Sequence, residues 1–378
     1  MQILVTAEMF GYGPIITGNY LVESLKKKIN AYWVFMGSGI AMEQAKRSNM
    51  FDEYVACETY KLEDLEKNRE YFESSDAVIS SENLQGAIFC VRNSFKVYYI
   101  DNLFWLWNKI PDELNRVACY FMVDCFNTKE NIKRIGSGIQ RYELVGPLRK
   151  NVLRDSEKKE NKVIINIGGA DSFLSSFELV KEFYRIVLSG IISKSKEANV
   201  TDIIVCGGKA MIDGLRCYFL NENTVRFESF SKDEYLHEIS QARYVFLSPG
   251  LGNFFECLNF SVPVMMLPPI NYSQFWQMEE YKKIDFGISM LNWCDFQNYI
   301  TVERDVEEKV GVDQVLANVH NFIKDKKAWQ LLNMEFQKYF DIDTIDCSIR
   351  KEYQNKYKVN GIDKIAEVIS KEMAYVNI

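Results

Sequence analysis

The feature that most constrains the fold is an alternation of short apolar runs with helical patterns. Apolar runs typical of β-strands occupy residues 2–7, 31–36, 77–80, 96–100 and 118–123. Helical patterns occupy residues 15–28 and 60–73 between them. Short apolar strands that alternate with helices are typical of a parallel sheet covered by helices on both faces. The sequence therefore predicts an α/β fold.

The same alternation restarts near residue 162. Predicted strands lie at 163–167, 202–206, 225–227, 244–247 and 262–267, with helices at 173–189, 232–241 and 253–259. A chain of 378 residues is longer than one hydrophobic core usually holds. The charged stretch Arg149–Lys162 between the two halves is interpreted as a linker. We expect domains at 1–148 and 149–345, followed by a C-terminal helical segment at 346–378.

Composition excludes several classes of function. The 45 Lys and Arg against 52 Asp and Glu give a net charge of −7, which argues against a protein that coats nucleic acid or an anionic membrane. With no run of 18 apolar residues and no basic segment at the start, we expect a cytoplasmic protein without membrane association. The nine cysteines form no Cys-x-x-Cys pair and there are two histidines, so no metal site is predicted. A homodimer is compatible with this composition.

Three glycine-containing loops follow predicted strands and open helices: Gly11–Gly13, Gly168–Gly169 and Gly250–Gly252. Glycine allows a tight turn and close approach of an anion, which a helix N-terminus then attracts. None of the loops is a P-loop, and Gly11–Gly13 lacks the third glycine of a dinucleotide fingerprint because Ile16 stands there. These loops predict binding of a phosphate-containing ligand that is neither a P-loop nucleotide nor a nicotinamide dinucleotide.

The stretch 247–281 carries the most specific signal. Glu256 lies six residues after Gly250, inside the helix that the glycine turn begins. A carboxylate at that place can accept two hydrogen bonds from a ribose diol while the start of the helix holds a diphosphate. The amides of Gln274 and Gln277 could bond sugar hydroxyls.

This stretch resembles the nucleotide-sugar signature of GT-B glycosyltransferases, above all the peptidoglycan N-acetylglucosaminyltransferases and the related UDP-sugar hydrolases of pseudaminic acid synthesis. The resemblance implies two Rossmann-like domains facing a cleft, with a C-terminal helix that crosses back to the N-terminal domain. It also implies that Glu256 binds the ribose and that Gln274 faces the donor sugar. The remaining donor-site residues that it implies here are Gly250, Leu251, Gly252, Asn253 and Gln277.

Upstream segments resemble the same family in order, so the similarity runs from residue 2 to about 285. Residues 145–149 are similar to the family's interdomain segment, whose arginine, here Arg149, lies near the phosphates. Gly168, Gly169 and Ser172 match its second glycine loop. Residues 227–231 are similar to the segment whose backbone reads the uracil, which implies that role for Phe230 and Ser231.

The sequence departs from the family at one catalytic position. The family's N-terminal loop carries a histidine after its glycines, whereas here Pro14 follows the predicted acceptor loop of Gly11, Tyr12 and Gly13. Because proline transfers no proton, the base would have to be a carboxylate or come from the acceptor itself. Glu8, Asp101 and Asp124 each end a predicted strand, and burial can raise the pKa of such a group.

Asp101 is the preferred base, since the aromatic run 102–107 that follows could floor an acceptor site, with packing in the core as the alternative for that run. For each of the three carboxylates, a helix cap or turn role is the alternative.

The resemblance implies transfer of a sugar from a nucleotide diphosphate sugar, with a UDP-linked donor favoured, to a small soluble acceptor. No Asp-x-Asp signature is present, so the reaction is expected to need no metal and no cofactor beyond the donor substrate. Two alternatives stay open. One is hydrolysis or epimerisation of the nucleotide sugar, and the other is a non-catalytic nucleotide-binding partner subunit.

Overall fold

The computed structural model describes residues 1–149, 159–170, 172, 174–342, 344–357 and 360–374. The chain divides into two compact units. The first unit comprises Met1–Asn151 with Tyr357–Ile378, and the second comprises Val152–Lys356.

A seven-stranded parallel sheet forms the centre of the first unit, in the order β3-β2-β1-β4-β5-β6-β7. Its strands are apolar on both sides, and residues such as Leu4, Val34 and Tyr120 are fully buried beneath the covering helices. The strands are β1 (Gln2–Ala7), β2 (Tyr32–Gly37), β3 (Glu53–Ala56), β4 (Ala77–Ser81), β5 (Val97–Asp101), β6 (Cys119–Val123) and β7 (Tyr142–Val145). The helices are α1 (Gly13–Lys26), α2 (Gly39–Ser48), α3 (Leu62–Lys67), α4 (Arg69–Glu73), α5 (Leu84–Arg92) and α6 (Thr128–Ile135), with a 3₁₀ turn at Asp112–Arg116.

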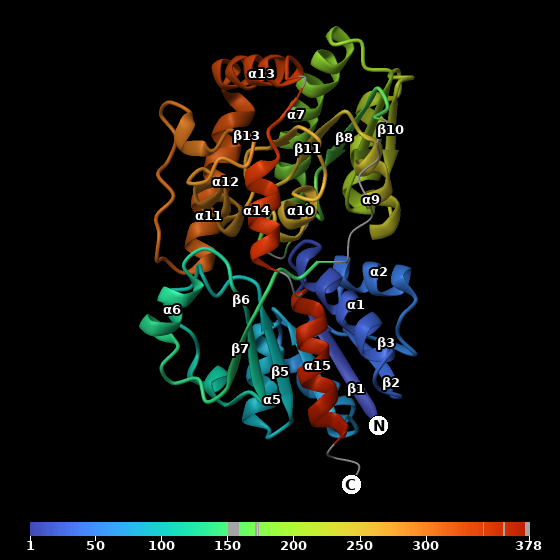
Figure 1. The fold of residues 1–378 in the computed structure, drawn as a ribbon, viewed down its shortest axis with the longest axis vertical. Coiled ribbons are helices and arrows are strands. Elements are labelled where there is room, and N and C mark those ends of the chain that lie inside the picture. The colour runs from blue at the N-terminus through green and yellow to red at the C-terminus, as the bar shows by residue number, and fades with distance from the viewer. Residues whose placement is uncertain (150–158, 171, 173, 343, 358–359, 375–378) are drawn as a thin grey trace. The chain divides into compact units, whose positions relative to one another are not determined.

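The last helix, α15 (Gly361–Ala374), belongs to the first unit although it ends the chain. It packs against α1 and β7 (Figure 1), and its apolar residues Ile362, Ile365 and Ile369 are buried there. Ser24 of α1 also donates to the carboxylate of Asp363 at 3.2 Å. The expected return of the C-terminal helix to the N-terminal unit is confirmed.

The second unit has a six-stranded parallel sheet in the order β10-β9-β8-β11-β12-β13. The predicted parallel α/β architecture is therefore confirmed in both halves. The strands are β8 (Lys162–Asn166), β9 (Asp202–Cys206), β10 (Val225–Glu228), β11 (Tyr244–Leu247), β12 (Val264–Met266) and β13 (Ile288–Met290). The helices are α7 (Phe177–Glu197), α8 (Lys209–Arg216), α9 (Lys232–Gln241), α10 (Leu251–Cys257), α11 (Tyr272–Tyr281), α12 (Glu308–Lys324), α13 (Lys326–Phe340) and α14 (Ser348–Lys356), with 3₁₀ turns at Cys217–Phe219 and Trp293–Asp295.

Helix α7 differs from the predicted 173–189 at both ends. It begins at Phe177 because the side chain of Ser176 accepts a hydrogen bond from the N–H of Leu179 and caps it. It continues through Gly190 to Glu197. A Cβ on Gly190 would lie 2.2 Å from the Asn333 side chain, so this glycine allows close packing of α13 rather than ending the helix.

Helix α14 lies in the second unit, so the structure separates it from the following helix, with which the sequence grouped it as residues 346–378. Arg350 anchors α14, and its side chain is fully buried. The guanidinium donates to four backbone carbonyls at 2.7–2.9 Å, those of Phe260, Val262, Phe286 and Gly287.

Strand order places the glycine loops at comparable points of the two sheets. In each sheet, successive strands are first added on one side of the first strand and later on its other side. The strand order therefore reverses between β1 and β4 and between β8 and β11. Ligands of open parallel sheets bind outside the carboxyl ends of strands at this reversal. Gly11 follows β1, Gly168 follows β8 and Gly250 follows β11, so all three predicted loops lie where the topology favours a ligand.

Candidate functional site

The two glycine loops of the second unit are tied to each other by Asn166, the last residue of β8. Its side-chain oxygen accepts the N–H of Gly168 at 2.7 Å, and its carbonyl accepts the N–H of Ser248 at 2.7 Å. Gly168 has a φ of +68°, a left-handed conformation that favours glycine. The predicted loop residues Gly168 and Gly169 thus lie beside the loop that leads to Gly250.

The backbone around Gly250 is open. A Cβ built on Gly250 or Gly252 would meet no atom within 4 Å, whereas the intervening Leu251 is buried and anchors the turn. Asn253 is partly exposed on the first turn of α10. A ligand can therefore approach this backbone closely.

Glu256 lies on α10 with its side chain only 2% exposed. Its carboxylate forms an ion pair with the ammonium of Lys232, the first residue of α9. The same ammonium lies over the ring of Tyr235, 4.7 Å from the ring centroid. A buried carboxylate is costly unless it is paired, so Lys232 explains how Glu256 can be charged at this depth. Sequence reasoning missed Lys232.

The two glutamines of α11 occupy different environments. Gln274 donates to the Ser248 hydroxyl at 3.2 Å and accepts the N–H of Ile270 at 2.9 Å, so it lies at the carboxyl edge of the sheet. Gln277 is 3% exposed, and within the described residues its side-chain oxygen has no hydrogen-bond partner. The Gln274 side chain thus contacts Ser248, in the loop that leads to Gly250.

The remaining predicted donor residues are spread over both units. Ser231 caps α9 in a capping box with Glu234, and Phe230 beside it is partly buried. Ser172 accepts the N–H of Leu174 in the loop after β8. Arg149 lies in the first unit after β7, where its carbonyl accepts a hydrogen bond from Asn360.

In the first unit, Glu8 follows β1 and contacts a polar cluster. One of its oxygens accepts from the Asn83 amide at 3.1 Å and the other from the N–H of Met9 at 3.2 Å. Burial raises the pKa of Glu8, and the hydrogen bonds from Asn83 and Met9 oppose that shift. Asn83, which sequence reasoning missed, is fully buried and also donates to the Thr59 hydroxyl at 2.9 Å. Its place two residues after the end of β4 was the available signal.

The acceptor loop predicted at Gly11, Tyr12 and Gly13 adjoins Glu8. Gly11 has a φ of +64°, and a Cβ on Gly11 or Gly13 would meet nothing within 4 Å. Pro14 is buried in the first turn of α1, where its fixed φ fits a helix start, and its carbonyl accepts the Ser81 hydroxyl.

Asp101 is 2% exposed and its oxygens are occupied by hydrogen bonds. Tyr120 and Trp107 donate to one oxygen at 2.6 and 3.1 Å, and the N–H of Leu103 donates to the other at 2.6 Å. Burial raises the pKa of Asp101 to about 6, although these hydrogen bonds lower it. The carboxylate therefore fixes the aromatic run after β5 in place.

The raised pKa of Asp101 predicts that the stability of the protein depends on pH. The folded protein holds a proton on Asp101 more tightly than the unfolded chain, so the contribution of Asp101 to the free energy of unfolding falls as pH rises from about 4 to about 6. The fall is expected to reach about 3 kcal/mol. It should be measured by urea unfolding of the wild type and Asp101→Asn, followed by tryptophan fluorescence. A wild-type-minus-variant difference that stays constant across this pH range would contradict it.

Asp124 follows β6 and pairs with Lys129 at 2.9 Å, while its carbonyl accepts the Tyr357 hydroxyl. Strands β1, β5 and β6 are not all neighbours, since β4 lies between β1 and β5. With about 4.8 Å between strands, Glu8 and Asp101 are separated by roughly 10 Å across the sheet. The three carboxylates thus share one edge of the sheet without forming one cluster.

Other polar and hollow features lie away from these loops. Among the described residues, no three His, Cys, Asp or Glu side chains are grouped to hold a metal, and no helix has the length and apolar character needed to cross a bilayer.

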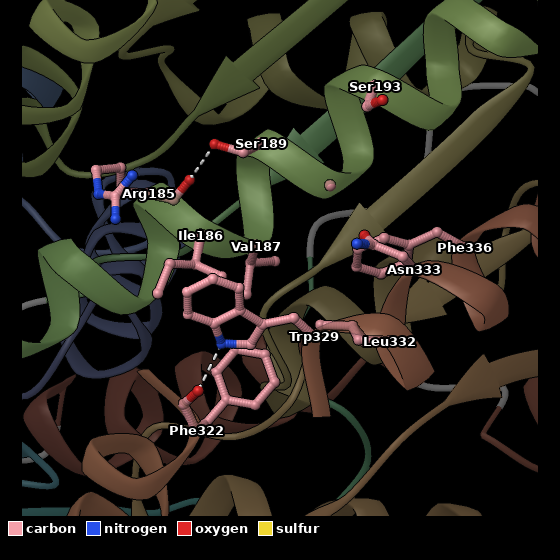
Figure 2. A pocket seen from close by; sticks show the side chains of 11 residues that line it. Arg185, Ile186, Val187, Ser189, Ser193, Phe322, Trp329, Leu332, Asn333 and Phe336 are labelled. Carbon is pink, nitrogen blue, oxygen red and sulfur yellow. Dashed lines mark hydrogen bonds between the residues drawn. The ribbon is translucent and has the colours of Figure 1, made fainter. Parts of the chain in front are cut away.

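Figure 2 shows a cavity of about 250 Å³ between helices, lined by residues of α7, α12 and α13 such as Ile186, Phe322 and Trp329. None of the predicted site residues lines it.

No protein-family model matches this chain, and no curated protein matches it. Solved structures do match it over nearly its full length. A UDP-GlcNAc 2-epimerase from Methanocaldococcus jannaschii, in complex with UDP-GlcNAc and UDP, has 12% identity and a TM-score of 0.55, covering 98% of this chain and 100% of its own. The glycosyltransferase of kitacinnamycin has 11% identity and a TM-score of 0.53, covering 98% of each chain. The spinosyn rhamnosyltransferase complexed with thymidine diphosphate has 9% identity and a TM-score of 0.50, covering 94% of this chain and 100% of its own. Two parallel Rossmann-like sheets, a C-terminal helix that returns to the first unit and these matches show that the chain has the GT-B fold.

Proposed function

We propose that this protein is a glycosyltransferase that moves a sugar from a nucleotide diphosphate sugar, UDP-linked, to a small soluble acceptor. The observation that carries the proposal is the placement of Glu256, paired with Lys232, on the helix that follows the open Gly250–Gly252 turn. A charged carboxylate beside an open backbone suits a ribose diol joined to a diphosphate. Transfer would then need a base for the acceptor hydroxyl.

Glu8 suits the role of base better than Asp101 or Asp124. It is partly exposed and adjoins the open backbone of Gly11–Gly13, so an acceptor can reach it. Asp101 is buried under three donors, and Asp124 is held by Lys129. We retain Arg149, the Gly168 loop and Gln274 as proposed contacts of the donor.

Epimerisation or hydrolysis of the nucleotide sugar is a second candidate. The similarity to the UDP-GlcNAc 2-epimerase is the observation that supports epimerisation. Incubation with UDP-GlcNAc separates these reactions by product: a glycoside in the presence of an acceptor, free N-acetylglucosamine, or an epimer.

Replacing Glu256 with alanine is expected to weaken UDP binding by roughly 10- to 150-fold, because a charge-assisted contact of about 1.5–3 kcal/mol is lost. Calorimetric titration with UDP, thymidine diphosphate, GDP and CDP measures this and the nucleotide preference together. Glu178→Ala is the control, since it removes a carboxylate that is 74% exposed in the same unit. Equal UDP affinity in Glu256→Ala and the wild type would overturn the ribose role, and preference for another diphosphate would change the proposed donor. A wild type that binds UDP but yields none of these products with any acceptor would leave a non-catalytic partner subunit as the function.

A further inference from the structure

We propose that Lys232 is a positioning residue of the nucleotide site, which orients the Glu256 carboxylate for the ribose hydroxyls and so makes binding selective for ribonucleotides. The inference rests on the proposed function and extends it to a residue outside the motifs of the sequence. Its basis is an ion pair between two helices, in which the side chain of Glu256 is 2% exposed and that of Lys232 is 16% exposed.

The ion pair joins the two elements that a nucleoside would contact. Lys232 begins α9 directly after Ser231, the last residue of the segment proposed to read the base. Glu256 lies on α10, which follows the open turn proposed for the diphosphate. One lysine therefore fixes the carboxylate relative to both segments.

The ion pair is compatible with a bound ribose. A carboxylate offers about four lone-pair positions, so pairing with an ammonium does not by itself exclude hydrogen bonds from a diol. The ring of Tyr235 holds the ammonium from another side at 4.7 Å, which limits how the lysine can move away. The pair is neutral as a whole, so a diol can bind the carboxylate without the cost of leaving an unpaired buried charge.

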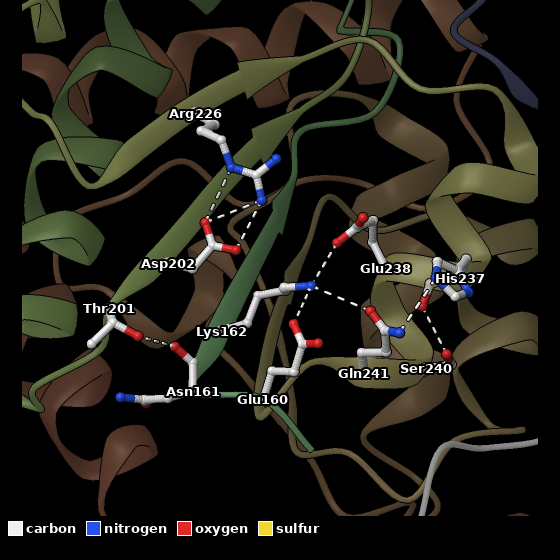
Figure 3. A network of polar contacts seen from close by, with 10 residues as sticks. All are labelled: Glu160, Asn161, Lys162, Thr201, Asp202, Arg226, His237, Glu238, Ser240 and Gln241. Atoms are coloured by element: carbon white, nitrogen blue, oxygen red, sulfur yellow. Dashed lines mark hydrogen bonds and ion pairs between the residues drawn. The ribbon is translucent and has the colours of Figure 1, made fainter. Parts of the chain in front are cut away.

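A second buried lysine in the same unit shows what a purely structural pair looks like. Lys162 begins β8, at the end of the strand opposite the glycine loops. Its ammonium contacts Glu160 at 2.7 Å, Glu238 at 2.8 Å and Gln241 at 3.4 Å (Figure 3), which engages its three donors with protein acceptors. Lys162 is thus the matched control for Lys232.

The test compares UDP with 2′,3′-dideoxyuridine diphosphate, which lacks both ribose hydroxyls, by calorimetry. Lys232→Met is expected to weaken UDP binding roughly 10-fold or more and to change binding of the dideoxy compound by about twofold at most. Lys232→Arg keeps the positive charge and should weaken UDP binding less than Lys232→Met does. Lys162→Met should lower stability in urea while leaving the UDP affinity within about threefold of the wild type. If Lys232→Met does not fold, Lys232→Gln provides the same comparison.

Equal losses for both ligands in Lys232→Met would overturn the inference, because the lysine would then act on the diphosphate or on the fold as a whole. An unchanged UDP affinity in Lys232→Met, with a wild type that still prefers UDP to the dideoxy compound, would also overturn it while leaving the proposed function intact. A wild type that binds neither compound would refute the proposed function itself.

Discussion

Replacing Arg350 with methionine is expected to destabilise the second unit by about 3–5 kcal/mol, one of the largest effects of a single substitution in this chain. Arg350 is fully buried and donates to four backbone carbonyls. These carbonyls remain in place whatever side chain occupies position 350. Methionine fills much of the same volume but leaves these acceptors without donors, and each buried unsatisfied group costs about 1–3 kcal/mol. Lysine keeps the charge, yet its single ammonium cannot replace a planar guanidinium that spans several carbonyls.

Urea unfolding monitored by tryptophan fluorescence measures this loss, since Trp276, Trp293 and Trp329 report on the second unit. Lys351→Met is the matched control, because it makes the same chemical change at the neighbouring, exposed position of α14. It should change the free energy of unfolding by less than about 0.5 kcal/mol. If Arg350→Met and Lys351→Met unfold at the same urea concentration, the four carbonyl contacts do not stabilise the unit.

The layered fold was predictable because its signals are local. Apolar strand runs and the glycine loops that end them are readable within a few residues, and parallel sheets bury such strands on both faces. The strands β3, β7 and β13 were not predicted because most of their residues are partly exposed, whereas the equally short β11 and β12 are fully buried apolar runs. Their pairing depends on the neighbouring strand rather than on their own sequence.

The paired charges of the site were not predictable, because they depend on contacts between distant segments. Lys232 is 24 residues from Glu256 in sequence, and a lysine at the start of a polar helix normally indicates a solvated surface. Arg350 lies in the polar sequence of α14, which gives no sign of burial. Asp101 was identified as a carboxylate at a strand end, but its occupied oxygens follow from Tyr120 on the next strand.

Replacing Glu8 with glutamine is expected to lower turnover of the nucleotide sugar by about 10²- to 10⁴-fold, the usual contribution of a general base. Glutamine has nearly the same shape and can still accept from Asn83, so the fold and the UDP affinity should change little. Turnover is measured as UDP released from UDP-GlcNAc, with the acceptor if one is found. Retention of full activity would exclude Glu8 as the base.

The pH profile separates the candidate bases, because a base works only when ionised. Since burial raises the pKa of Glu8, kcat/KM of the wild type should fall as pH drops through that raised value. Asn83→Ala removes a hydrogen bond that lowers this pKa, so the acidic limb should move to higher pH. If Glu8 is the base, Asp101→Asn should leave the acidic limb of the profile in place. An acidic limb near pH 6 that disappears in Asp101→Asn would instead assign the proton transfer to Asp101. If Asn83 positions Glu8, Asn83→Ala must shift the acidic limb of the kcat/KM profile. A loss of fold stability alone would lower activity at every pH and leave the position of that limb unchanged.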